Sequence, residues 1–209
     1  EDILTNQNYI QKGVVLDKLI ESLIISKIDY NDIIVGDKNA LLIASRVLGY
    51  GKDYSFKGYS REEGIIKEFK IDLTTLKDKI LKKKDLKEVG INEFDFELPH
   101  TKKVITFKLL THGDEKSIEK EVVGQNKIRP GSNPEISTRL KYIITSVDGD
   151  SEKKTIREFV DFQLLARDSK SLRDEVKKVS PDVNLNYTGE DGEEDINIPI
   201  NLSFFWPDA

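Results

Sequence analysis

The chain has 209 residues, of which 37% are hydrophobic and 34% charged, a profile typical of a soluble globular protein. It contains no cysteine, which excludes a disulfide scaffold, a thiol nucleophile, an iron–sulfur cluster and every zinc site that needs a thiolate. The two histidines, His100 and His112, are too few for a metal site built on several imidazoles. We therefore expect no metal and no cofactor.

Charge and hydropathy narrow the expected partners. The 33 basic and 38 acidic residues give a formal charge of -5, which disfavours a domain that neutralises many phosphates, so nucleic acid is not an expected partner. The sequence has no apolar run of membrane-spanning length, and Glu1-Asp2 lacks the pattern of a signal peptide, so we expect no membrane contact and an intracellular location. Because the chain opens without Met, we expect a native N-terminal stretch to have been processed off or to lie outside it.

The N-terminal part of the chain predicts two helices. A stripe of apolar residues at helical spacing indicates a first helix that starts between Thr5 and Gly13. The stripe consists of Leu16, Leu19, Ile20, Leu23 and Ile24. A second helix is expected from Asp37, after a turn at Gly36, and two glycines stop it beyond Leu48.

Alternation with a period of two predicts two β-hairpins. The strands of the first lie around residues 54–56 and 65–73, and those of the second around residues 94–98 and 104–109. Residues 70–90 contain seven lysines interleaved with carboxylates and no aromatic residue. We interpret this stretch as a solvated helix or connector; a nucleic-acid patch is the alternative.

The second half of the chain predicts several helices and a closing hairpin. The helices are expected after His112 and over residues 135–147, 156–164 and 168–179. Pro130 and Pro134 mark a loop before the second of them. Strands around residues 183–187 and 196–202 follow, joined by a turn at 189–195. The fold class is therefore α+β, with helices combined with antiparallel β-hairpins.

The first and last thirds of the chain resemble two copies of one unit. Without a gap, residues 37–73 align with residues 168–204, and each copy is a capped helix followed by a hairpin of equal length. The matched pairs include Leu41 with Leu172, Phe56 with Tyr187 and Phe69 with Ile200. A lone hairpin is marginally stable in water, so each needs a surface to pack against, either its own helix or the other copy. We expect one α+β domain over residues 1–209 with two pseudo-equivalent halves; convergence on a common unit is the alternative.

The sequence lacks the motifs of a phosphate-binding loop, a dinucleotide-binding fold, a metalloprotease helix and a serine nucleophile elbow. His112, next to Asp114 and Glu115, has the residue types of a general base with its orienting carboxylate, but a cap at a helix start is the favoured interpretation. The acidic cluster at residues 190–195 is interpreted as a solvated hairpin tip, with weak binding of a hard cation as the alternative. We expect no enzymatic activity, and a small hydrolase that uses His112 is a remote alternative.

Three large aromatic residues, Phe204, Phe205 and Trp206, stand together before Pro207. If they continue a strand, successive side chains point to opposite faces, and at least one of the three is exposed or docked elsewhere. Such a side chain is a candidate anchor for a protein contact. The alternative is that both faces of the strand are covered within the monomer.

Two sequence blocks point to a known family. One runs from Val35-Gly36-Asp37-Lys38-Asn39-Ala40 to Arg46-Val47-Leu48-Gly49-Tyr50-Gly51, and the other is Phe204-Phe205-Trp206-Pro207. Together they resemble the T4-like phage baseplate protein family, which includes the baseplate hub subunit and hub assembly proteins of contractile tails. Further similar blocks at residues 107–111, 146–149 and 166–173 follow in the same order, so the resemblance spans nearly the whole chain.

The resemblance implies a non-enzymatic role in building the central hub of a viral tail baseplate, through contacts with other hub or tail proteins. It implies a location in the host cytoplasm during assembly, with the virion tail baseplate as a further expectation. A transient tail assembly chaperone, absent from the finished virion, is the alternative. The expected contact residues are Arg46, Tyr50, Phe205 and Trp206. The oligomeric state stays open.

Some members of the family carry paired cysteines in the two hairpins, which suggests hairpin tips stapled by zinc. The equivalent regions here, residues 57–64 and 188–195, have none. Zinc is therefore not carried over to this chain, and we expect turn chemistry and packing to hold these tips.

Overall fold

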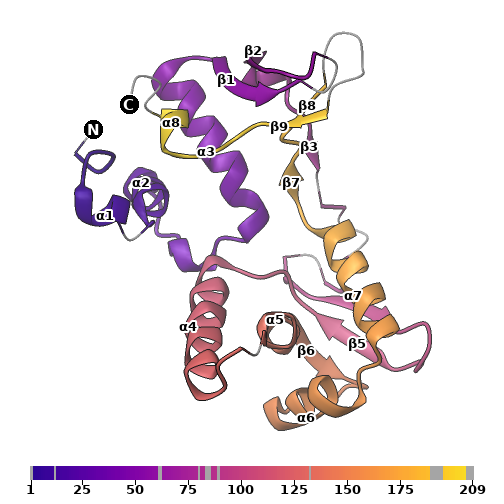
Figure 1. The fold of residues 1–209 in the computed structure, drawn as a ribbon. Coiled ribbons are helices and arrows are strands. Elements are labelled where there is room, and N and C mark those ends of the chain that lie inside the picture. Colours follow the sequence, from indigo (N-terminus) through magenta and orange to yellow (C-terminus); the bar gives the residue numbers. More distant parts are fainter. Residues whose placement is uncertain are drawn as a thin grey trace. The chain divides into compact units, whose positions relative to one another are not determined.

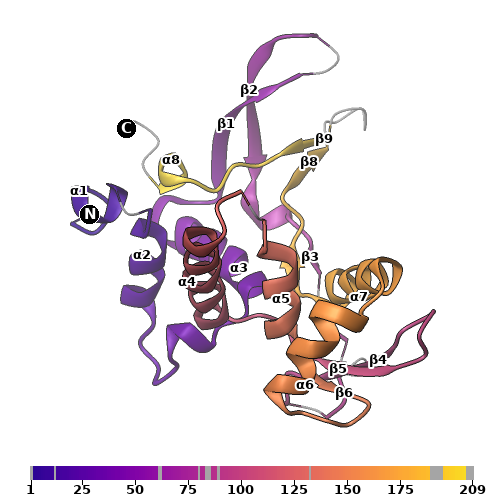
Figure 2. The same ribbon diagram turned by 60° about the horizontal axis from the view of Figure 1, so that its bottom comes forward.

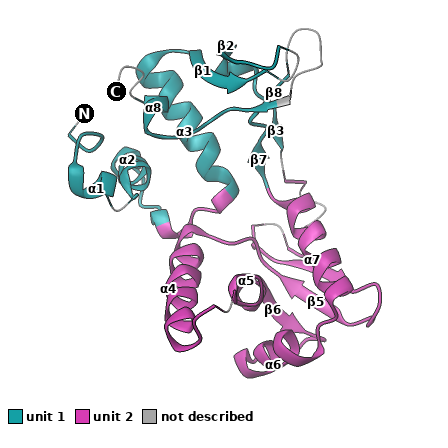
Figure 3. Ribbon diagram, in the orientation of Figure 1, with its two compact units in different colours: residues 1–30, 36–79, 181–209 teal, residues 31–35, 80–180 magenta. Residues whose placement is uncertain are grey.

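A computed structural model describes residues 2–11, 13–60, 63–79, 81–82, 86–88, 90–131, 133–188 and 195–205. The fold is α+β, as predicted. The chain divides into two compact units, where the sequence had suggested one domain (Figure 3). Unit 1 comprises residues 1–30, 36–79 and 181–209, and unit 2 comprises residues 31–35 and 80–180. The last 29 residues thus return to the unit that the N-terminal part begins.

The described helices of unit 1 are α1 (Gln7–Gln11), α2 (Val15–Leu23), α3 (Val35–Tyr50) and α8 (Leu202–Phe205), with a short 3-10 turn at Tyr30–Asp32 before α3. The two helices predicted for the N-terminal part are present as α2 and α3, and the described part of unit 1 also contains two short helices, α1 and α8, that were not predicted (Figure 1). Helix α3 begins two residues earlier than predicted, and Gly36 lies in its first turn. A Cβ at Gly36 would lie 1.8 Å from the carbonyl oxygen of Pro181, so a glycine is needed where these two segments meet.

The strands of unit 1 form three two-stranded ladders. These are β1 (Asp53–Tyr59) with β2 (Ile66–Asp72), β3 (Asp78–Lys79) with β7 (Asp182–Val183), and β8 (Asn186–Thr188) with β9 (Asp195–Asn197), and the 3-10 turn Leu73–Thr75 follows β2. All three pairs are antiparallel. The predicted first hairpin is confirmed, with Phe56 opposite Phe69.

The two hairpins of unit 1 pack on each other through aromatic rings, and both ribbon views show β8 and β9 close to β1 and β2 (Figure 2). The ring centroid of Tyr187 lies 5.5 Å from that of Phe69 and 6.1 Å from that of Phe56. The predicted equal length of the two hairpins is wrong, because Tyr187 pairs with Ile196 and not with Ile200. Pro199 offers no N–H to a ladder, so the second hairpin ends before the position that the repeat assigned to it.

Unit 2 combines a three-stranded antiparallel sheet with helices. The sheet has the order β4 (Phe94–Glu97), β5 (Val104–Phe107), β6 (Ile144–Val147), which confirms the predicted second hairpin. The helices are α4 (His112–Ile128), α5 (Glu135–Ile143), α6 (Lys153–Glu158), a π-helix (Phe159–Gln163) that continues α6, and α7 (Ala166–Val179). Helices α4 and α5 pack against each other, and the predicted proline loop joins them.

The prediction of one helix over residues 135–147 is wrong. The chain leaves the helical conformation at Ile144 and forms β6, which pairs with β5 through a register shift. Ile143, Ile144 and Val147 satisfy helical spacing, but Ile144, Thr145 and Val147 are also β-branched, a class favoured on a pleated surface. The open edge of β5 therefore decides between two conformations that the local sequence allows.

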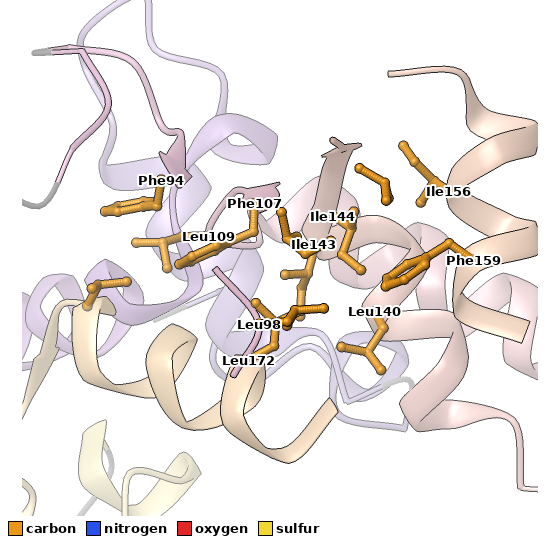
Figure 4. Packing of buried hydrophobic residues seen from close by; sticks show 13 residues of the cluster. Phe94, Leu98, Phe107, Leu109, Leu140, Ile143, Ile144, Ile156, Phe159 and Leu172 are labelled. Carbon is orange, nitrogen blue, oxygen red and sulfur yellow. The ribbon is translucent and has the colours of Figure 1, made fainter. Parts of the chain in front are cut away.

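A hydrophobic core fills the space between the sheet and the helices of unit 2 (Figure 4). Its members are Phe94, Leu98, Ile105, Phe107, Leu109, Leu140, Ile143, Ile144, Val147, Ile156, Phe159, Leu172 and Val179. Phe94 and Phe107 face each other across β4 and β5, with ring centroids 5.2 Å apart. Every regular element of unit 2 except α4 supplies at least one of these side chains, so the core ties the sheet to α5, α6 and α7.

The lysine-rich stretch predicted as a solvated helix or connector is a connector over the residues that are described. It contains the 3-10 turn after β2 and the two residues of β3, and residues 86–88 form a bend. Residues 80, 83–85 and 89 lie outside the described part of the chain.

Candidate protein-contact surface

The predicted contact residues Arg46 and Tyr50 lie one turn apart on α3. The Arg46 guanidinium lies 4.9 Å from the centroid of the Tyr50 ring and 5.9 Å from that of Tyr54, and it also donates to the carbonyl oxygen of Gly51 at 3.4 Å. Arg46 is 5% exposed and Tyr50 is half exposed. Arg46 therefore packs within unit 1, whereas Tyr50 is half exposed and its role in contacts stays a prediction.

Phe204 and Phe205, near the C-terminus, are not in a strand. Phe204 and Phe205 lie in α8, and both are buried. The Phe204 ring meets the Tyr54 ring edge-on, with centroids 4.7 Å apart. A helical turn lets two adjacent rings enter one core, so the expectation of opposite faces fails here, and burial gives Phe205 a packing role inside unit 1. Trp206 lies outside the described residues, and so does the acidic cluster 190–195 apart from the backbone of Asp195.

Asp114, the carboxylate beside His112 in the hydrolase alternative, takes part in a helix cap. The Thr111 hydroxyl accepts a hydrogen bond from the Asp114 N–H, and the Asp114 carboxylate accepts one from the Thr111 N–H, so both residues form a capping box for α4. The Asp114 carboxylate also binds the Lys108 ammonium, at 2.7 and 2.8 Å. The Asp114 carboxylate thus binds the cap N–H and Lys108. This supports the interpretation favoured from the sequence, in which His112 and Asp114 belong to a capped helix start.

A hollowed surface lies on unit 2, around the C-terminal end of α4, α5, α6 and the π-helix. Three adjoining hollows of about 620, 390 and 410 Å³ make it up. They share lining residues: Lys141 lines the first and second, Phe162 the first and third, and Arg157 the second and third. We call this continuous region the Phe162 surface. Its other lining residues used below are Lys108, Asp114, Ile128, Arg129, Pro134, Lys153, Lys154, Glu158 and Asp161.

Phe162 lies in the π-helix and stands in solvent. Phe159 is buried in the core, whereas Phe162 is 84% exposed. At α-helical spacing Phe162 already lies off the apolar stripe to which Phe159 belongs. The Leu164 N–H donates to the Phe159 carbonyl at 2.8 Å, a bond of the wider π turn, and this turn rotates Phe162 further from the core. Single π turns are frequent at functional sites.

Cations outnumber carboxylates on the Phe162 surface. Six cations and three carboxylates are among the described residues that line it, although the whole chain carries a formal charge of -5. Lys141 lies 2.6 Å from an oxygen of Asp161, and Lys108 is held by Asp114. Arg157 is 4.0 Å from Glu121, and Lys153 has no ion pair among the described residues. Of these four cations, Arg157 and Lys153 are therefore the more available to an incoming anion.

Sequence reasoning missed this surface, although one signal was present. The apolar face predicted for residues 156–164 consists of Ile156, Phe159, Val160 and Leu164, and Phe162 falls off it. A large aromatic residue on the polar side of an amphipathic helix indicates a contact outside the core. Ile128, 80% exposed at the end of α4, carries the same signal.

Comparison with known proteins gives no match: no family model, no curated protein and no solved structure is similar to this chain. In the part of the chain that the structure describes, no helix has both the length and the apolar character to cross a membrane. Within the same ranges, no group of three histidine, aspartate or glutamate side chains is arranged to hold a metal ion.

Proposed function

We propose that this protein works by protein–protein contact in building the baseplate hub of a contractile phage tail. The observation that carries the contact role is the Phe162 surface, where an exposed phenyl ring and an exposed isoleucine border a hollow on a well-packed unit. On a soluble protein, a contiguous group of exposed apolar side chains commonly marks a site of interaction with another molecule. The hub assignment rests on the sequence blocks that resemble the baseplate family.

The contact role also agrees with the chemistry of the chain. The carboxylate nearest in sequence to His112 caps a helix, and the sequence contains no thiol and none of the common catalytic motifs. A stable and specific contact buries about 1,200–2,000 Å² in total, and the Phe162 surface spans parts of three helices and a π turn. It therefore provides a centre for such an interface.

A structural subunit and an assembly chaperone differ in whether they remain in the particle. Quantitative mass spectrometry on purified tails and on baseplate intermediates, with this chain counted against a known tail protein, separates them. A hub subunit is present in both at one fixed small ratio. An assembly chaperone is present in the intermediates and absent from the finished tails. If the chain is absent from both fractions while it is expressed in infected cells, the proposed function is wrong.

A further inference from the structure

We propose that the Phe162 surface binds an acidic segment of a partner protein that inserts one apolar side chain beside Phe162. This inference rests on the proposed function, since it names the chemistry of the partner at the contact site. The residues that line the hollows indicate both parts of the partner's chemistry: an apolar side chain that inserts and carboxylates on either side of it.

The apolar half of the site is the largest hollow. Phe162, Ile128 and Pro134 contribute to its lining, and the first two are more exposed than almost any other apolar side chain of unit 2. When a solvent-exposed phenyl ring at a concave site packs against a second apolar group, both lose contact with water, and this favours binding. Aromatic residues are also enriched among the side chains that contribute most of the binding energy of an interface. An inserted aromatic or branched aliphatic side chain fits this description.

The charged half of the site lies next to it, over α6. Lys153 and Arg157 line the second and third hollows together, and neither forms a close ion pair among the described residues. Lys141 is held by Asp161, which leaves a forked guanidinium and a mobile ammonium to meet carboxylates. Carboxylates of an incoming segment would complement this excess of positive charge, which stands out on an acidic chain.

Nucleic acid fits the same cations less well. Asp161 and Glu158 lie among them on the lining of the third hollow, where they would face a phosphate backbone at close range. A protein segment can space its carboxylates to avoid them, whereas a backbone with a charge on every phosphate cannot. The described lining residues include two aromatic residues, Phe162 in the first and third hollows and Tyr142 in the second. They line no hollow in common, and the Tyr142 hydroxyl donates to Glu121, so they form no continuous stacking platform for successive bases.

A symmetric pair of this chain is disfavoured by the same charges. A two-fold contact sets one patch against an identical patch, so Arg157 and Lys153 of one copy would approach those of the other. Like charges at close range cost binding energy. The observations therefore favour a different protein with an acidic segment.

Fluorescence anisotropy tests the proposal on the full chain. The probe is a fluorescein-labelled twelve-residue peptide of glutamate, aspartate and glycine with one central phenylalanine. Two comparison peptides replace the phenylalanine by alanine or the acids by their amides. We expect the first peptide to bind, both changes to weaken it about tenfold or more, and added salt to weaken it further.

Substitutions in the protein locate the site. Phe162→Ala and Arg157→Glu change exposed side chains, so the fold should survive, and each is expected to weaken the peptide about tenfold or more. Leu165→Ala and Lys170→Glu make the same two kinds of change at exposed positions of unit 2 outside the surface and should leave binding within about twofold. Circular dichroism of each variant confirms that it is folded.

Four results would overturn the proposal. The acidic peptide fails to bind, or it binds with equal strength to the Phe162→Ala variant. A twelve-nucleotide single strand of DNA binds more tightly than the peptide and depends on Arg157. Sedimentation shows a dimer of the chain that Phe162→Ala dissolves, which would make the occupant a second copy. None of these results changes the count of the chain in tails, so a failure here is distinguishable from a failure of the proposed hub function.

Discussion

Arg46 illustrates, at the scale of a single residue, why a charged side chain is a poor guide to the surface. It is buried, and its Nε has no hydrogen-bond partner among the described residues. The guanidinium instead lies against the rings of Tyr50 and Tyr54. A guanidinium is weakly hydrated and stacks on aromatic faces, so it can enter a core that would reject an ammonium. Spacing by one helical turn made Arg46 and Tyr50 neighbours, and Tyr54 completes the cluster from β1.

Replacement of Gly58 by a residue with a Cβ should destabilise the protein. A Cβ there would lie 2.8 Å from Cγ2 of Ile196 and 3.2 Å from Cε2 of Phe69, where the two hairpins of unit 1 meet. Both neighbours are themselves held in packed strands, so they cannot move away freely. Gly58→Ala should lower the free energy of unfolding by about 1–3 kcal/mol, measured by urea denaturation followed by circular dichroism.

A matched glycine provides the control. Gly124 lies within α4, and no heavy atom lies within 4 Å of the position of its Cβ. Gly124→Ala should raise the free energy of unfolding by about 0.5–1 kcal/mol, because alanine restricts the unfolded chain and favours helix. If Gly58→Ala is as stabilising as Gly124→Ala, the contact between the hairpins does not exist in solution.

Helix α7 and the turn between β4 and β5 are joined, at the scale of elements, by one carboxylate. Asp168, fully buried in the first turn of α7, accepts hydrogen bonds from the His100 N–H at 2.9 Å and from the Thr101 N–H at 3.0 Å. Burial disfavours the ionised form, but these hydrogen bonds outweigh it and lower the pKa of the Asp168 carboxyl. The N-terminus of the helix favours the same charge.

This carboxylate makes the stability of the protein depend on pH. Since its pKa is lower in the folded state than the value of about 3.9 typical of an unfolded chain, its contribution is complete above that pH and is lost as the pH falls through the folded pKa. Asp168→Asn should lower the urea midpoint at pH 7, and its midpoint should approach that of the wild type as the pH falls through the folded pKa. Asp174→Asn changes an exposed residue of the same helix and should alter neither the urea midpoint at pH 7 nor its dependence on pH. An unchanged pH dependence in Asp168→Asn would contradict this account.

The sequence predicted elements well where local and tertiary preferences agree, as in β1, β2, β4, β5 and α4. It failed where the two compete. Residues 144–147 fit both a helix and a strand, and pairing with β5 selects the strand. Phe204 and Phe205 looked like the end of a strand, but Pro199 ends the ladder early, and the rings then reach the core from a helical turn.

The candidate surface could not be read from the sequence for a related reason. Phe162 lies in a π turn, and no local pattern distinguishes a π turn from the continuation of α6. The hollows beside it are lined by residues from 108 to 162, brought together only by the packing of α5 on α4 and on the π-helix. Sequence could place an aromatic residue off the apolar stripe, but it could not show that a cationic hollow lies beside it.

At the scale of the whole molecule, the two units differ in what surrounds their exposed apolar side chains. In unit 1 the rings of Tyr54, Phe69 and Phe204 pack where the hairpins and α8 meet, although Tyr50 and Tyr59 are exposed. In unit 2 the exposed side chains of Phe162 and Ile128 border a hollow that cations also line. A formal charge of -5 disfavours the binding of polyanions in general, so a local excess of cations can select for a particular acidic partner. We therefore expect the protein to contact its partner through unit 2.

Site-specific photocrosslinking during phage infection tests that claim most directly. The photoreactive residue p-benzoylphenylalanine replaces Phe162 in one variant and Leu165 in a control variant. The account predicts that, under illumination, the Phe162 variant forms one covalent adduct with a tail protein, that Arg157→Glu abolishes this adduct, and that the Leu165 variant forms little of it. Adducts of equal yield from both positions, or none from Phe162 while the chain enters tail intermediates, would contradict it.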